Sequence, residues 1–166
     1  MSQSELTADS FSPDTLDFLR TLKDHEVQYL IVGGEAVIFY GHARVTGDID
    51  FFYERSEGNA RRLFAALQDF WRGTVPGMED HTELLEPGLI LQFGVPPNRI
   101  DLINQIDGVN FLESWAKRFP VIVRSEREDI RIWLIGIEDL ICNKRASARP
   151  KDLDDLRFLE QRDLGG

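Results

Sequence analysis

Two short motifs held at a fixed spacing constrain this chain more than any other feature of its sequence. The pair Gly33-Gly34 follows one apolar run, and thirteen residues separate it from Asp48-Ile49-Asp50, which opens another. Side chains alternate along a strand, so Asp48 and Asp50 project from the same face. Two carboxylates at such a short distance repel each other, and burying them is costly unless a cation lies between them. The pattern therefore predicts a hard divalent ion such as Mg2+.

A third carboxylate falls inside another apolar strand, at Asp101 in residues 99–103. A lone buried carboxylate is costly and needs a partner. If this strand pairs beside residues 48–53, three carboxylates converge in a site able to hold two divalent ions. Asp101 could then also accept the proton of an attacking hydroxyl. The alternative is that Asp48 and Asp50 are solvated turn or edge-strand residues without a chemical role.

Length and composition indicate one ordinary globular domain. The chain has 166 residues, 42% of them hydrophobic and 29% charged, which suffices for a real core. Its formal net charge of -10 argues against an extended contact with DNA or RNA. No segment resembles a signal peptide or a membrane span, which predicts a cytoplasmic protein without membrane contact. The single cysteine, Cys142, excludes an internal disulfide, and its apolar neighbours predict packing in the core.

The apolar periodicity predicts helices and strands that alternate without strict βαβ order. Strands are expected at residues 27–32, 48–53, 89–93, 99–103, 121–124 and 130–134, and helices from Pro13 onward and at 35–41, 59–70, 111–118, 137–146 and 150–162. Ser12 before Pro13 is typical of a helix N-cap. This order predicts an α/β (α+β) fold with a mixed β-sheet and flanking helices. Residues 1–166 form one domain in this interpretation, with residues 1–10 disordered and 137–162 forming a C-terminal helical part.

Taken in order, these motifs resemble the signature of the nucleotidyltransferase superfamily, which has the DNA polymerase beta-like fold. That signature is a Gly-Gly or Gly-Ser pair after an apolar residue, then an Asp-x-Asp or Asp-x-Glu strand, then a third Asp. Two further segments are similar to small bacterial nucleotidyltransferases, which include toxin subunits of abortive-infection toxin–antitoxin pairs. They are Gly41-His42-x-Arg44-x-Thr46 and Lys144-Arg145-Ala146 followed by Arg149-Pro150-Lys151-Asp152-x-x-Asp155. The likeness covers residues 27–159.

The resemblance implies a role for each matching acid and glycine. Asp48, Asp50 and Asp101 would hold two Mg2+ ions, with Mn2+ as an alternative, and through them an NTP. Asp101 would also activate the acceptor, and Gly33 and Gly34 would line the phosphate path. Gly34 stands where the family often has a serine that donates a hydrogen bond to the phosphates.

Four other polar residues flank these motifs. Arg44 and Thr46 either contact phosphate or support the turn into the strand. Lys144 either reaches the phosphates as a point charge or belongs to a solvated helix face whose cations pair with nearby aspartates, namely Asp152, Asp154 and Asp155. Glu35 follows the glycines directly, and its charge would repel a triphosphate unless it faces away.

The activity implied by the resemblance is a Mg2+-dependent nucleotidyltransferase that moves an NMP from an NTP to a hydroxyl and releases pyrophosphate. The acceptor is a protein side chain, an RNA 3′ end or a small molecule, and the sequence does not choose among them. An antitoxin protein is implied as a partner. One alternative is a non-catalytic nucleotide-binding or partner-binding module of the same fold. Another is a nuclease or phosphatase that uses the same carboxylates to activate water.

Overall fold

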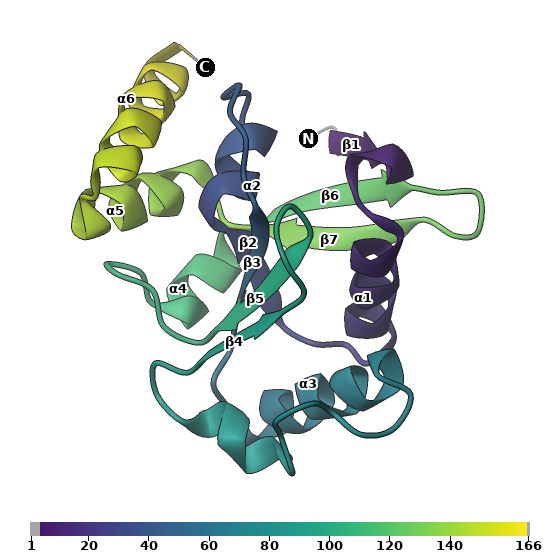
Figure 1. Ribbon diagram of the computed structural model, residues 1–166. Helices are drawn as coiled ribbons and strands as arrows, with labels where there is room; N and C mark the ends of the chain where they lie inside the picture. Colours follow the sequence, from purple (N-terminus) through teal and green to yellow (C-terminus); the bar gives the residue numbers. More distant parts are fainter. Residues whose placement is uncertain (1–3, 166) are drawn as a thin grey trace.

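A seven-stranded mixed sheet forms the centre of the computed structural model, which describes residues 4–165 (Figure 1). The strand order is β1-β6-β7-β2-β3-β5-β4. The strands are β1 (Ser4–Thr7), β2 (Tyr29–Val32), β3 (Asp48–Tyr53), β4 (Ile90–Phe93), β5 (Arg99–Ile103), β6 (Phe119–Arg124) and β7 (Ile130–Leu134). The predicted α+β fold with a mixed sheet and flanking helices is confirmed.

The helices begin close to the positions that the sequence indicates. They are α1 (Pro13–Asp24), α2 (Gly33–Phe39), α3 (Glu57–Phe70), α4 (Phe111–Ala116), α5 (Ile137–Ser147) and α6 (Pro150–Gly165), with short 3-10 helices at Ala8–Ser10 and His81–Leu85. Ser12 caps α1 as predicted, because its hydroxyl accepts a hydrogen bond from the Thr15 amide at 3.1 Å. α2 begins at Gly33, two residues before the predicted start at residue 35, and Gly33 itself has a left-handed backbone with φ +69°.

Helices cover both faces of the sheet, which is why all four residues of β2 are buried. Tyr29 and Ile31 point into a core shared with α1 and α3, whereas Leu30 and Val32 face a second core with α2, α5 and α6. In Figure 1, α1 and α3 lie on one side of β2 and β3, and α4, α5 and α6 lie on the other. Each fully buried side chain of this kind contributes roughly 1.5–3 kcal/mol to folding.

The disorder expected for residues 1–10 was wrong for residues 4–10, and residues 1–3 lie outside the described part of the chain. β1 pairs in parallel with β6, from Ser4 opposite Val121 to Thr7 opposite Arg124. Glu5 adds an ion pair with Arg124 at 2.6 Å. A four-residue strand carries little local signal, because its stability comes from pairing with β6, which lies far away in the sequence.

Two smaller findings concern single features. Cys142 is exposed, so its predicted core position was wrong. The buried side of α5 instead carries Leu140, Ile141 and Lys144. Within residues 4–165, no helix combines the length and the apolar character that a bilayer span requires.

Candidate active site

Three carboxylates converge on one face of the sheet, at adjacent strands. β3 and β5 run in parallel with Asp50 opposite Asp101 and Asp48 opposite Arg99. One carboxylate oxygen from each of Asp48, Asp50 and Asp101 lies within 4.8 Å of the others. The predicted pairing of these two strands is confirmed, and the three residues form what we call the acid cluster.

The charge balance of the acid cluster favours a cation. Burial, followed by the charges of Asp48 and Asp101, raises the pKa of Asp50 to about 7. Repulsion among the carboxylates would be relieved by a divalent ion, and three carboxylate oxygens are the donors that hard ions such as Mg2+ prefer. The donor set therefore fits the ion that the sequence predicts, and Asp48, Asp50 and Asp101 are the residues that could hold it.

Arg99 is part of this site, although the sequence analysis assigned it no role. Its Nε donates to Asp101 Oδ1 at 2.8 Å, and its Nη2 donates to Asp48 Oδ2 at 2.7 Å. The guanidinium therefore bridges two carboxylates of the acid cluster. Its position two residues before Asp101 in the same strand is the signal that could have revealed it, because side chains at that spacing share a face.

Close packing explains why glycines precede the acid cluster. Gly33 has φ +69°, and a Cβ added there would overlap Asp50 Oδ2. A Cβ at Gly34 would lie 2.9 Å from Thr46 Oγ1, so a larger residue there would require the Thr46 side chain to shift. The backbone conformation favours glycine at Gly33, and the absence of a side chain at both positions lets Asp50 and Thr46 lie close to α2. Their role along a phosphate path stays a prediction.

The loop between α2 and β3 sends one side chain to the acid cluster and another away from it. Thr46 Oγ1 donates to Asp48 Oδ1 at 3.2 Å and so helps to orient that carboxylate. Arg44 instead donates from Nη1 to Asp155 Oδ2 at 2.8 Å, on α6. In this structure Thr46 touches the acid cluster, and Arg44 ties the loop to the C-terminal helices.

Lys144 lies in a buried ion network, not on a solvated helix face. Only 4% of its surface is exposed. Its Nζ lies 3.0 Å from Asp152 Oδ1 and 3.1 Å from Asp155 Oδ2. Burial alone would raise the pKa of Asp152, but hydrogen bonds from Arg149 and Lys144 hold this pKa well below its usual range. The predicted partners Asp152 and Asp155 are thus correct, and the predicted solvent exposure is wrong for Lys144.

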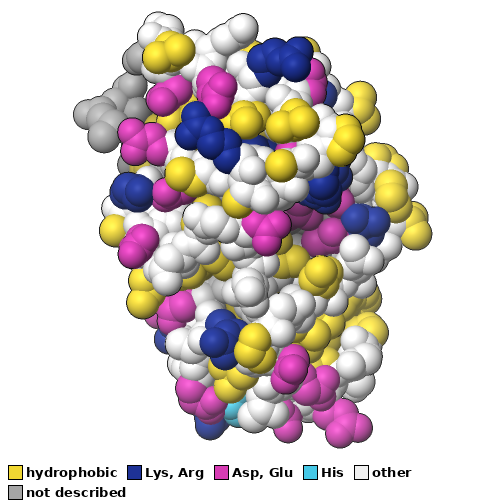
Figure 2. Space-filling view, turned by 90° about the vertical axis from the view of Figure 1, so that its left-hand side faces the viewer, with side chains coloured by type: hydrophobic (Ala, Val, Ile, Leu, Met, Phe, Trp, Pro, Cys, Tyr) yellow, Lys and Arg dark blue, Asp and Glu magenta, His cyan; other side chains and the backbone are white. Residues whose placement is uncertain are grey.

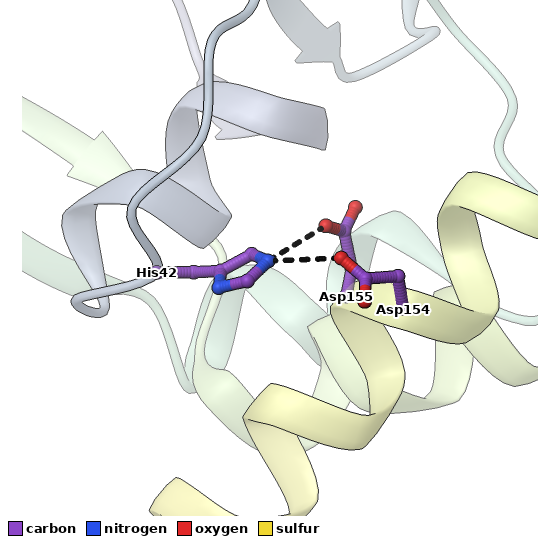
Figure 3. Close-up of side chains that lie close together, drawn as sticks. All are labelled: His42, Asp154 and Asp155. Atoms are coloured by element: carbon purple, nitrogen blue, oxygen red, sulfur yellow. Dashed lines mark hydrogen bonds and ion pairs between the residues drawn. The ribbon is translucent and has the colours of Figure 1, made fainter.

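His42 joins the same network (Figure 3). Its Nε2 lies 3.2 Å from Asp154 Oδ2 and 3.8 Å from Asp155 Oδ1, and its ring stacks on Phe158 with 4.6 Å between centroids. These three polar groups are close enough to bind an ion. However, Asp155 already contacts Arg44 at 2.8 Å, so a cationic side chain fills that role and the cluster acts as a clamp between loop and helix.

The comparison with known families decides the broad class of the protein. The model of a family described as "nucleotidyltransferase of unknown function (DUF6036)" matches residues 15–161. The chain belongs to this family. A search of curated proteins found no match.

In this family member a cavity of about 360 Å³ opens beside the acid cluster. Its lining includes Gly33, Asp50, Asp107, Lys144 and Arg149. The Arg149 side chain is 60% exposed and pairs with Asp152 at 2.7 Å, so it places a positive charge at the rim that is partly balanced by this aspartate. Asp50 of the acid cluster thus lines the same cavity as Lys144 and Arg149. This combination suits a phosphate that is bound together with a metal ion.

The face of the protein shown in Figure 2 carries charges of both signs. Figure 2 shows Lys and Arg side chains interspersed with Asp and Glu on this face. A long nucleic acid needs a continuous basic surface. On the face shown, the Lys and Arg side chains are instead separated by acidic and neutral residues. Glu35 does not line the cavity beside Asp50. It lines separate cavities on the Asp48 side, so its charge is kept out of that cavity.

Proposed function

We propose that this family member is a Mg2+-dependent nucleotidyltransferase with the DNA polymerase beta-like fold. It transfers an NMP from an NTP to a hydroxyl and releases pyrophosphate. The observation that supports this most is the convergence of Asp48, Asp50 and Asp101 within 4.8 Å on adjacent strands. A pair of divalent ions bound there, with Mn2+ as an alternative to Mg2+, would neutralise the charge that builds up on the phosphates during in-line displacement.

The chain's own residues would divide the remaining work. Asp101, the most buried of the three acids, accepts the proton of the acceptor hydroxyl as its oxygen attacks the α-phosphorus. Thr46 keeps Asp48 oriented through its 3.2 Å hydrogen bond. Arg149 contacts phosphate oxygens from the cavity rim, and Lys144 contributes positive charge from the wall. Gly33 and Gly34 allow the nucleotide close to the start of α2.

Arg99 favours a second candidate function, a non-catalytic nucleotide-binding or partner-binding module. Its guanidinium already satisfies Asp48 and Asp101 at 2.7 and 2.8 Å, so this pair has a counter-ion without any metal. A module of this kind would bind a nucleotide with the same affinity in the presence and absence of Mg2+. The transferase, in contrast, needs the ion for both tight binding and turnover.

The partners follow from the same proposal. An acceptor in the cytoplasm would be a protein side chain, an RNA 3′ end or a small molecule. The net charge of -10 disfavours an extended nucleic-acid contact. A role as the toxin of a toxin–antitoxin pair, held inactive by an antitoxin protein, is supported by the resemblance of its motifs to abortive-infection toxins alone.

The deciding experiment measures pyrophosphate and transferred label together. The protein is incubated with four α-labelled NTPs and a cell extract, with Mg2+ or with a chelator. We expect label on one acceptor and release of pyrophosphate, both lost with the chelator and in Asp50→Asn. Asp107→Asn is the matched control, because Asp107 lines the same cavity but lies outside the acid cluster, and it should keep most of the activity.

The other functions give different results in that assay. Nucleotide binding that is indifferent to Mg2+, without pyrophosphate, supports the non-catalytic module. Inorganic phosphate or cleaved nucleic acid, lost in Asp50→Asn, supports a phosphatase or nuclease. Equal loss of transfer in Asp50→Asn and Asp107→Asn contradicts the specific role given to the acid cluster.

A further inference from the structure

The largest cavity described for the chain lies apart from the one beside Asp50. It measures about 570 Å³ and is lined by β1, the 3-10 helix after it, α2 and the strands β2, β6 and β7. Aromatic rings from Phe11, Phe39, Tyr40 and Phe119 line it. In Figure 1, α2 stands between α6 on one side and β1 on the other, and residues from all three elements line this cavity. Its volume is that of a small-molecule site.

Glu35, in the first turn of α2, is the distinctive polar group of this cavity. Its carboxylate is half-buried, and within residues 4–165 it has neither an ion-pair partner nor a side-chain hydrogen bond. Burial, and then the charge of Asp48, raises the pKa of this carboxyl above its ordinary value. A half-buried carboxylate without a partner is costly, so the site would gain from a ligand that brings a positive charge.

Of the two other charged residues in the described lining, Glu5 is ion-paired and Arg162 is hydrogen-bonded to a neutral carbonyl. Glu5 pairs with Arg124 at 2.6 Å. Arg162 donates from Nε to the Tyr40 carbonyl oxygen at 2.9 Å. Glu35 is therefore the carboxylate in the described lining that still lacks a counter-ion.

This cavity leads toward the acid cluster. A smaller cavity of about 80 Å³ shares Ser10, Phe11 and Glu35 with it. The smaller cavity is also lined by Thr46 and Asp48. A molecule held among the aromatic rings would thus have Glu35 beside it and the edge of the acid cluster beyond. The 360 Å³ cavity, which we assign to the nucleotide, meets the acid cluster from the other side, at Asp50.

We propose that the 570 Å³ cavity binds the acceptor, and that the acceptor is a small organic cation carrying a hydroxyl. A protonated amine would pair with Glu35, and an apolar or aromatic body would lie among Phe11, Phe39 and Phe119. The hydroxyl would extend toward Asp48. An RNA end fits poorly, because Glu35 would repel its phosphates.

This inference rests on the proposed transferase and narrows its acceptor. In the reaction, the acceptor oxygen forms a bond to the α-phosphorus of the NTP as the bond between that phosphorus and the bridging oxygen breaks. Pyrophosphate leaves with the bond electrons, and the hydroxyl proton passes to a carboxylate of the acid cluster and then to solvent. The products are pyrophosphate and the acceptor with the NMP attached to its hydroxyl oxygen as a phosphodiester. The amine is unchanged, and no oxidation state changes.

Binding can be tested without catalysis. The full-length ¹⁵N-labelled protein is titrated with phenylalaninol, which carries an amine, a hydroxyl and a ring, and then with N-acetylphenylalaninol and phenyllactate. We expect phenylalaninol alone to shift the amide signals of cavity residues such as Phe39 and Phe119. Glu35→Gln should weaken this binding by roughly 10-fold, the size expected for a charged hydrogen bond.

Glu5→Gln is the matched control, since it removes a carboxylate of the same cavity that is already paired. It should change the affinity for phenylalaninol by less than about 2-fold, as exposed ion pairs contribute little. Equal weakening by Glu5→Gln and Glu35→Gln would reduce the effect to general surface charge and overturn the proposal. So would equal binding of the acetylated or acidic compound, signals shifted elsewhere, or no binding of phenylalaninol.

The same titration on Asp50→Asn separates this inference from the transferase proposal. The variant should still bind phenylalaninol, because Asp50 does not line the larger cavity. Glu35-dependent amine binding without pyrophosphate release from any NTP would leave the amine site standing and remove the transferase. Pyrophosphate release with an acceptor that binds independently of Glu35 would support the transferase and remove the amine site.

Discussion

Lys144→Ala should destabilise the protein far more than the neighbouring change Arg145→Ala. Both substitutions remove a cation that links α5 to α6. Lys144 and its partners Asp152 and Asp155 have side chains only 5%, 0% and 1% exposed. Breaking a buried ion pair by removing one partner costs about 3–5 kcal/mol, because a charge is left buried without compensation.

The contacts that remain place Lys144→Ala at the lower end of that range. Asp152 keeps Arg149 at 2.7 Å, and Asp155 keeps Arg44 at 2.8 Å, so neither carboxylate is left alone. We therefore expect a loss of about 3 kcal/mol in the free energy of unfolding, or a melting temperature lower by roughly 6–12 °C in a chain of this size.

The control substitution removes an exposed pair on the same two helices. Arg145 lies 2.7 Å from Glu160, with side chains 60% and 40% exposed, so its loss should cost at most about 1 kcal/mol. Equilibrium urea unfolding of both variants and the wild type gives the midpoint and the slope for each. If the two variants differ by less than about 0.5 kcal/mol, the scale of a neutral surface change, the buried network does not stabilise the fold as argued.

Three further predictions concern the acid cluster. Burial raises the folded pKa of Asp50 to about 7, so with a chelator present stability should be highest at acidic pH and fall by roughly 2–3 kcal/mol from about pH 5 to about pH 8. This contribution is complete below the unfolded pKa and is lost as pH rises through the folded pKa. Urea titrations of Asp50→Asn should lack that fall, and an unchanged profile would contradict the assignment. Arg99→Gln should lower the melting temperature in chelator and recover in Mg2+, because an ion replaces the guanidinium. Arg124→Gln is the control, because it removes a strand arginine that bridges exposed carboxylates, and Mg2+ should not change its melting temperature. If the melting temperature of Arg99→Gln stays low in Mg2+, the ion does not replace the guanidinium. Gly33→Ala should lower the free energy of unfolding in urea by about 1–3 kcal/mol more than Gly77→Ala. The backbone is similar at the two positions, with φ +69° at Gly33 and +74° at Gly77, but of these two only Gly33 places the added Cβ against another residue. Equal losses would argue against close packing at the acid cluster.

The acid cluster could be predicted because its cause is local and periodic. Asp48 and Asp50 share a face by the alternation of any strand, and a lone acid in an apolar strand such as Asp101 requires a partner. The cap at Ser12 is equally local, since it needs only the first turn of α1. These inferences depended on few residues at fixed short spacings, and the structure agrees with each of them.

The features that were missed depend on contacts between distant segments. Whether Lys144 is solvated or buried is decided by the packing of α6 on α5, which helical periodicity does not specify. Whether residues 4–7 are ordered depends on the free edge of β6. The 570 Å³ cavity around Glu35 is bounded by residues from segments far apart in the sequence, so no local pattern could show it.

The clamp between the α2–β3 loop and α6 has a consequence for when the protein becomes competent during its synthesis. Asp155 holds Arg44 of that loop, and the loop leads directly into β3. A nascent chain that has not yet released α6 from the ribosome can assemble the sheet, but its loop has no anchor. A proteolytic fragment cut before α6 would be in the same state, so the loop before β3 should become anchored only once α6 has been made and packed.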